Sequence, residues 1–143
     1  MCGFTGITHK NIMNIYESYK KRFEESYQFI RDRGPDHKGI WHDENSFFLH
    51  ARLSIIDIKK TSSQPMELEG HVICYNGEIY NFKSIRNELQ KKGYIFKTTG
   101  DTEVVLKAWV EWGKNMLSRL DGMFSFSIWS KKDKTLFLAR DRF

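Results

Sequence analysis

The chain has 143 residues, of which 40% are hydrophobic and 15% aromatic, and it carries a formal net charge of +5. This length suits one well-packed domain, and no apolar run approaches the roughly 20 residues that a membrane-spanning helix needs. The N-terminus lacks the basic-then-apolar layout of a signal peptide, so we expect a soluble cytoplasmic protein that does not bind membranes.

The first half of the chain predicts strands around one long helix. Residues 3–8 favour a short strand. Apolar side chains then recur every three or four residues across 11–31, which predicts an amphipathic helix with one buried stripe. Gly34-Pro35 ends this helix, because proline disfavours helical backbone in the residue before it. Residues 38–42 and 46–53 predict a pair of strands.

The second half predicts alternating strands and helices and then a hairpin. These elements lie, in chain order, at 71–76, 82–92, 94–97, 102–112, 124–128 and 135–139. Asn76-Gly77 is interpreted as the turn that ends the first of these strands. Asn81 is predicted to cap the first helix, and Asp101 or Thr102 to cap the second. Hairpins combined with helices indicate the α+β class, with two antiparallel sheets packed together and covered by helices.

Charge and cysteine usage exclude several kinds of site. A net charge of +5 would allow nucleic-acid binding, but the basic residues form short dispersed groups such as Lys20-Lys21-Arg22, so we expect no nucleic-acid partner. The five histidines and two cysteines lack the close spacing of zinc ligands, so no metal site is predicted. Cys74 lies in an apolar run and is interpreted as a buried strand cysteine.

Cys2 is the candidate nucleophile. Removal of Met1 would leave Cys2 with a free α-amino group, which titrates at about 7.7–8.0 when unperturbed. One residue would then hold both a nucleophile and a base. A disulfide would consume the thiol, so this chemistry requires a reducing compartment. A lone Cys2 would be read as part of a frayed terminus, and only the polar segments downstream argue otherwise.

Four of these segments lie beside predicted strand ends or helix caps, where sites are usually built; they are 33–36, 50–57, 75–81 and 99–103. The side-chain amide of Asn76 and the backbone N–H of Gly77 can donate to an oxyanion. Arg52 can hold a carboxylate through two parallel hydrogen bonds, and Asp101, with Glu78, can hold an ammonium group. The substrate that fits these groups is an amino acid with a side-chain amide.

Each of these residues also has a purely structural interpretation. Asn76-Gly77 is a common type I′ hairpin turn, Asp101 can be only a helix cap, and Arg52 can pair with Asp57. Taken singly, these interpretations are at least as good as the functional ones. They explain poorly why all the residues occur together with Cys2.

Seven segments together resemble the N-terminal glutaminase domain of glutamine-dependent asparagine synthetases, over essentially the whole chain. The segments are Met1-Cys2-Gly3, RGPD at 33–36, HARLSIID at 50–57, SQPM at 63–66, YNGEIYN at 75–81, GDTEV at 100–104 and LDGMFSFSIW at 120–129. Such domains are class II glutamine amidotransferases. The resemblance implies the N-terminal nucleophile hydrolase fold, an αββα four-layer sandwich with two antiparallel sheets.

The resemblance also implies a role for each matching residue. Cys2 would form a γ-glutamyl thioester, with its own amine as base and then acid, and Asn76 and Gly77 would form the oxyanion hole. Arg52 would bind the glutamine α-carboxylate, and Asp101 with Glu78 the α-amino group. The backbone of Leu53, Ser54, Ile55 and Ile56 would line the pocket, and the RGPD segment would support the site.

We therefore predict that residues 1–143 are a glutaminase domain that converts glutamine to glutamate and ammonia without metal or cofactor. The chain ends inside an ARDRFG-like segment, so we expect a domain truncated at its C-terminal end, with the synthetase domain absent. That domain would be the partner that uses ATP and Mg to make asparagine from aspartate. Apolar surface left uncovered would favour a homodimer.

Three alternatives remain open at this stage. The same domain can feed the amidation of a sugar or another carboxylate. It can also be a catalytically silent glutamine-binding domain, which retention of Met1 would favour. A basic nucleic-acid-binding module ranks last.

Overall fold

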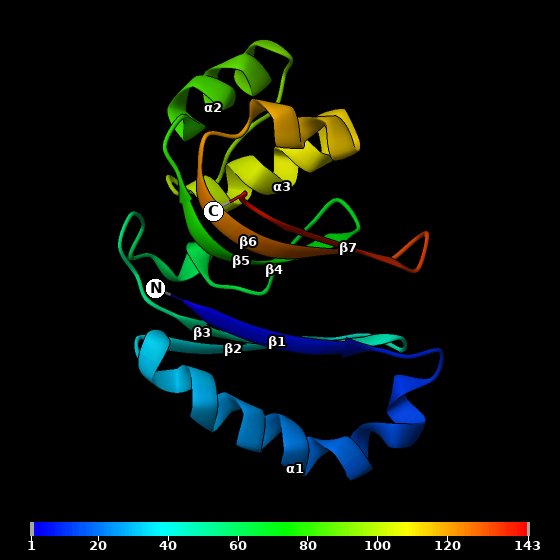
Figure 1. Ribbon diagram of the computed structural model, residues 1–143. Helices are drawn as coiled ribbons and strands as arrows, with labels where there is room; N and C mark the ends of the chain where they lie inside the picture. The colour runs from blue at the N-terminus through cyan, green and yellow to red at the C-terminus, as the bar shows by residue number, and fades with distance from the viewer. Residues whose placement is uncertain (1, 143) are drawn as a thin grey trace.

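Two antiparallel sheets lie face to face in the computed structural model, which describes residues 2–142 apart from the side chain of Met13 (Figure 1). Helix α1 (Ile12–Ile30) covers the outer face of one sheet. Helices α2 (Phe82–Lys91) and α3 (Asp101–Trp112) cover the outer face of the other (Figure 1). These four layers confirm the predicted αββα sandwich. None of the described helices is long and apolar enough to cross a membrane.

The first sheet has the strand order β1-β3-β2. Its strands are β1 (Gly3–Thr8), β2 (His37–His42) and β3 (Ser46–Arg52). Every residue of the central strand β3 is buried, because successive side chains point to opposite faces and both faces are covered. Phe47 and Leu49 pack against the apolar stripe of α1, whereas Phe48 packs against the second sheet.

The second sheet has the strand order β4-β5-β6-β7. Its strands are β4 (Met66–Leu68), β5 (His71–Ile79), β6 (Gly122–Ser130) and β7 (Thr135–Arg140). On β5, Ile73 and Tyr75 belong to the core shared with α2 and α3, and Val72 and Cys74 pack toward the first sheet. By the same alternation, Asn76 lies on the face directed at the first sheet.

The turn predicted at Asn76-Gly77 is wrong, and so is the hairpin interpretation of this pair. Strand β5 runs straight through it to Ile79, because β6 pairs along its whole length, with Asn76 opposite Ser125 and Gly77 opposite Phe124. A Cβ atom on Gly77 would overlap the carbonyl oxygen of Met123. Glycine is needed here because the neighbouring strand comes so close.

The strand predicted at 94–97 does not form. The backbone N–H groups of Lys97 and Thr98 donate instead to the carboxylate of Glu103, at 3.0 and 2.7 Å. These N–H groups are therefore satisfied by a side chain and not by a neighbouring strand. The short strand β4 was not predicted. The described part of the chain also contains three 3₁₀ segments, at Arg31–Arg33, Lys60–Ser62 and Gly113–Arg119.

Both predicted helix caps lie at helix N-termini, but neither side chain caps its helix. The Asn81 amide donates to the carbonyl of Arg119 at 2.8 Å, and its carbonyl accepts the Asp121 N–H. Asp101 is the first residue of α3 and its carboxylate bonds to β5. Each side chain therefore joins a helix start to a distant segment.

Candidate active site

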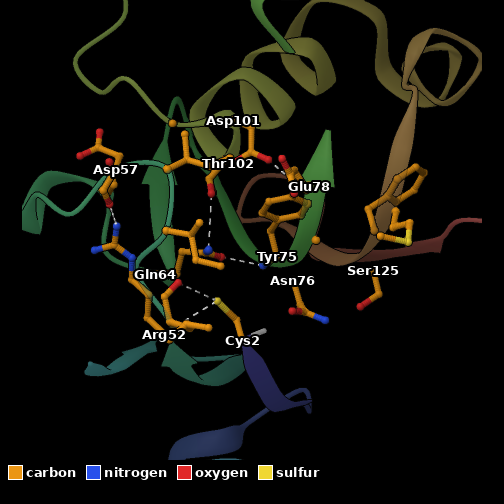
Figure 2. A pocket seen from close by; sticks show the side chains of 18 of the residues that line it. Cys2, Arg52, Asp57, Gln64, Tyr75, Asn76, Glu78, Asp101, Thr102 and Ser125 are labelled. Atoms are coloured by element: carbon orange, nitrogen blue, oxygen red, sulfur yellow. Dashed lines mark hydrogen bonds between the residues drawn. The ribbon is translucent and has the colours of Figure 1, made fainter. Parts of the chain in front are cut away.

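A cavity of about 380 Å³ lies where the two sheets and the start of α3 meet (Figure 2). This is within the size range of small-molecule sites, ~300–1,000 Å³. All the site residues predicted from the sequence line it, except Ser54; they are Cys2, Arg52, Leu53, Ile55, Ile56, Asn76, Gly77, Glu78 and Asp101. Ser54 lines a separate hollow with Asp36 and His37.

Cys2 is half-buried and directly precedes β1. The backbone N–H of Leu53 donates to the Cys2 sulfur at 3.4 Å, and the thiol lies 3.6 Å from the carbonyl of the same residue (Figure 2). Arg33 Nε donates to the Cys2 carbonyl at 3.2 Å. The thiol is thus held at the cavity wall. The predicted removal of Met1 lies outside the described residues.

The RGPD segment supports both Cys2 and the strand end that follows β3. A Cβ atom on Gly34 would overlap the backbone of Ala51, so this glycine permits close packing. The Asp36 N–H donates to the Arg52 carbonyl at 3.0 Å, and the Asp36 carboxylate accepts the Ser54 N–H at 2.7 Å. The segment therefore fixes the backbone on either side of Leu53.

Arg52, the last residue of β3, reaches the cavity from a nearly buried position with 7% exposure. Its guanidinium donates to the carbonyls of Lys59, at 3.1 Å, and of Asp57. Arg52 thus contacts Asp57, as the structural interpretation allows, but through the backbone carbonyl, because the Asp57 carboxylate accepts from the N–H and hydroxyl of Thr99. Burial would raise the pKa of Asp57, but hydrogen bonds from surrounding hydroxyl and backbone donors hold it well below its ordinary value.

Asn76 lines the cavity with its side-chain amide. Its Oδ1 is buried and has no hydrogen-bond partner within residues 2–142. In Figure 2, Cys2 and Asn76 lie toward the first sheet, whereas Asp101 and Thr102 lie on the opposite side of the cavity. A molecule that spans the cavity can therefore present one end to the thiol and the other to Asp101.

Sequence reasoning missed the residues that hold the cavity walls together. Tyr75 donates from its hydroxyl to Asp101 Oδ2 at 2.6 Å, and its backbone N–H donates to Gln64 Oε1 at 2.6 Å (Figure 2). The Gln64 amide in turn lies 3.4 Å from the hydroxyl of Thr102. Gln64 and Tyr75 lie in two of the segments that carry the family resemblance, SQPM and YNGEIYN, but the apolar run at 72–75 marks Tyr75 as core and gives no hint of its polar partners.

His50 links the two sheets beneath the site. It is fully buried on β3, and its Nε2 lies 3.0 Å from the Tyr75 carbonyl on β5, to which the Nε2–H donates. Burial lowers the pKa of His50 from the usual 6.5 to about 4, although the hydrogen bond to Tyr75 opposes this shift. The imidazole is therefore neutral near pH 7.

This neutral histidine predicts an acid-sensitive fold. The unfolded chain binds a proton at His50 near pH 6.5 and the folded chain only near pH 4, so protonation favours unfolding within that window. The stabilisation is fully present above about pH 6.5, and about 3 kcal/mol of it is lost as the pH falls to 4. Urea unfolding at pH 7 and pH 4.5 measures the loss. The loss of unfolding free energy between these two pH values should be much smaller in His50→Gln than in the wild type. In the exposed control His9→Gln it should stay at the wild-type value. Equal losses in the two variants would contradict the assignment of this acid sensitivity to His50.

Residues 1–143 match the family model described as a glutamine amidotransferase domain. The chain belongs to this family. Similar proteins include asparagine synthetase [glutamine-hydrolyzing] 1 of Bacillus subtilis, 42% identical over 145 residues that cover 100% of this chain and 23% of that protein. Asparagine synthetase B [glutamine-hydrolyzing] of Escherichia coli is 34% identical over 143 residues that cover 99% of this chain and 25% of that protein. This glutamine amidotransferase domain thus spans about a quarter of the length of these relatives.

A solved structure shares the fold of this amidotransferase domain. Glutamine phosphoribosylpyrophosphate amidotransferase from B. subtilis, in complex with ADP and GMP, superposes with a TM-score of 0.55 at 25% identity. The match covers 68% of this chain and 23% of that one. It supports the predicted N-terminal nucleophile hydrolase fold class.

Proposed function

We propose that this protein hydrolyses glutamine to glutamate and ammonia through a γ-glutamyl thioester on Cys2. The observation that carries the proposal is one cavity that brings together a thiol, a guanidinium group and a carboxylate, from Cys2, Arg52 and Asp101. These three groups match the side-chain amide, the α-carboxylate and the α-ammonium of glutamine. Membership of the glutamine amidotransferase family supports the same substrate.

The substrate is held at its α-carbon end. Arg52 binds the α-carboxylate by charge-assisted hydrogen bonds, and the Asp101 carboxylate, with Glu78 nearby in the cavity wall, binds the α-ammonium. This anchoring directs the amide across the cavity to Cys2. Leu53, Ile55 and Ile56 line the cavity beside the bound side chain.

Chemistry begins when the Cys2 sulfur attacks the amide carbon. The α-amine of a processed Cys2 accepts the thiol proton, and the carbonyl oxygen becomes an oxyanion that the Asn76 amide and the Gly77 N–H stabilise. Collapse of this intermediate breaks the C–N bond, and the protonated amine donates its proton to the departing ammonia. Water then attacks the thioester by the same steps, which releases glutamate and restores the thiol.

The deciding experiment measures ammonia and glutamate release from glutamine by the purified protein, with intact mass to record whether Met1 is removed. We expect both products in equal amounts from the protein that lacks Met1. Glutamine binding without turnover by that processed protein would contradict the proposal and favour a silent binding domain.

Arg52→Ala should chiefly weaken glutamine binding. Loss of hydrogen bonds between two charged groups costs about 1.5–3 kcal/mol, which predicts a KM higher by roughly 10- to 100-fold. The value of kcat should fall much less, because the amide still meets Cys2. Steady-state kinetics measures this, and Arg119→Ala is a matched control because Arg119 pairs with Glu88 on the surface. An unchanged KM in Arg52→Ala would contradict the proposal that Arg52 binds the α-carboxylate of glutamine.

The relatives' names support a proposal for the fate of the ammonia. Because they are glutamine-hydrolysing asparagine synthetases about four times as long as this chain, we infer that a synthetase domain receives the ammonia and makes asparagine from aspartate. ATP and Mg would act in that domain and not in this one. The test uses a protein that carries this domain together with its synthetase domain, incubated with ¹⁵N-amide glutamine and ATP and with aspartate or a sugar phosphate as acceptor: label must enter asparagine. The cytoplasmic location and a homodimer stay predictions, to be checked by fractionation and light scattering.

A further inference from the structure

Tyr75 connects the two ends of the candidate site, although the proposed chemistry gives it no role. Its side chain is only 3% exposed, yet each of its polar groups has a partner. The N–H donates to Gln64, the carbonyl accepts from His50, and the hydroxyl donates to Asp101 at 2.6 Å. Tyr75 also directly precedes Asn76 on β5.

The hydroxyl acts on one oxygen of Asp101 only. Asp101 Oδ2 accepts from the Tyr75 hydroxyl and, at 3.1 Å, from the backbone N–H of Ile79. Oδ1 takes part in no hydrogen bond within the described part of the chain, and Asp101 lines the cavity. Two donors thus fix the plane of the carboxylate and leave one oxygen for a bound molecule.

The partners of the Asp101 carboxylate are neutral hydrogen-bond donors and not a cation. Among the described residues, Asp101 forms no ion pair with lysine or arginine, so no cation neutralises it. A phenol donates a hydrogen bond without adding charge, and burial raises the pKa of Tyr75, which keeps the hydroxyl protonated. The result is an oriented anion at the end of the cavity opposite Cys2 (Figure 2).

Building on the proposed function, we propose that Tyr75 is a positioning residue that makes the site selective for substrates with an α-amino group. Its hydroxyl orients Asp101 so that the free oxygen meets the α-ammonium of glutamine. The selectivity follows because an amide without that ammonium gains nothing from an oriented Asp101.

The test compares two amides in Tyr75→Phe. Glutamine carries the α-amino group, and glutaramate, the monoamide of glutaric acid, lacks it. For Tyr75→Phe we expect kcat/KM for glutamine to fall about 10-fold, almost entirely through KM. The value for glutaramate should stay within about twofold, so the preference for glutamine contracts about 10-fold. Tyr94→Phe is the matched control, because its hydroxyl donates at 3.1 Å to Glu111, which does not line the cavity.

Calorimetric binding separates this inference from the proposed function. In a Cys2→Ala background, glutamine and glutaramate can be compared with and without Tyr75→Phe, whether or not the wild-type protein shows turnover. A contracted preference in binding supports the positioning role even if hydrolysis fails. An equal loss for both amides, an unchanged preference or no binding of glutamine overturns it. Thermal unfolding checks that Tyr75→Phe remains folded.

Discussion

Cys2→Ala abolishes the release of ammonia from glutamine, while the protein stays folded and still binds glutamine. Loss of the nucleophile should lower kcat by at least roughly 10⁴-fold, because the remaining donors can stabilise an oxyanion only if something attacks the amide. The fold should persist because Cys2 precedes β1 and its thiol, among residues 2–142, forms hydrogen bonds only with the Leu53 backbone. Ammonia release, circular dichroism and glutamine binding measure the three parts of this expectation.

Cys74→Ala is the internal control for this experiment. Cys74 is the other cysteine, and it is buried in the second sheet, where burial raises its pKa to about 12. Such a thiol is not a nucleophile at neutral pH. Cys74→Ala should therefore retain turnover, with a lower stability from lost packing. Turnover that survives Cys2→Ala, or that Cys74→Ala removes, would refute the thioester mechanism.

The elements set by local periodicity were predictable from the sequence. The apolar stripe of α1 and the alternation along β6 report which face is buried, whatever lies against it. The failures occurred where a distant residue decides the outcome. Residues 94–97 favour a strand, but Glu103 satisfies the backbone N–H groups of Lys97 and Thr98. Similarly, Asn76-Gly77 suits a turn, and only the long pairing of β5 with β6 extends the strand through it.

The residues of the candidate site likewise fall into two groups, those that could be predicted from the sequence and those that could not. The nucleophile, the donors and the charged binding groups could be proposed from the sequence, since each residue type suggests its own chemistry. Residues whose role depends on a partner could not be. His50 and Gln64 act on the backbone of Tyr75 from 25 and 11 positions away, and Tyr75 acts on Asp101 from 26 positions away. Only the juxtaposition of the two sheets and α3 reveals these contacts.

Asn76→Ala separates transition-state stabilisation from substrate binding. The Asn76 side chain lies on the face of β5 directed toward the first sheet and lines the cavity, so its Nδ2–H is the group that would donate to charge developing at the substrate oxygen. Removal of one oxyanion donor typically costs about 10²- to 10³-fold in kcat. The KM for glutamine should change little, because Arg52 and Asp101 hold the other end of the substrate.

Steady-state measurements of kcat and KM for Asn76→Ala test this prediction. Asn115→Ala is the control, because Asn115 is exposed in the 3₁₀ segment Gly113–Arg119. Equilibrium binding of glutamine to Asn76→Ala should match the wild type, which excludes a collapsed cavity. A change confined to KM would instead place Asn76 among the groups that hold the ground state. The backbone N–H of Gly77 would then be the one oxyanion donor left among those proposed from the described residues. It alone would have to stabilise the oxyanion during glutamine hydrolysis.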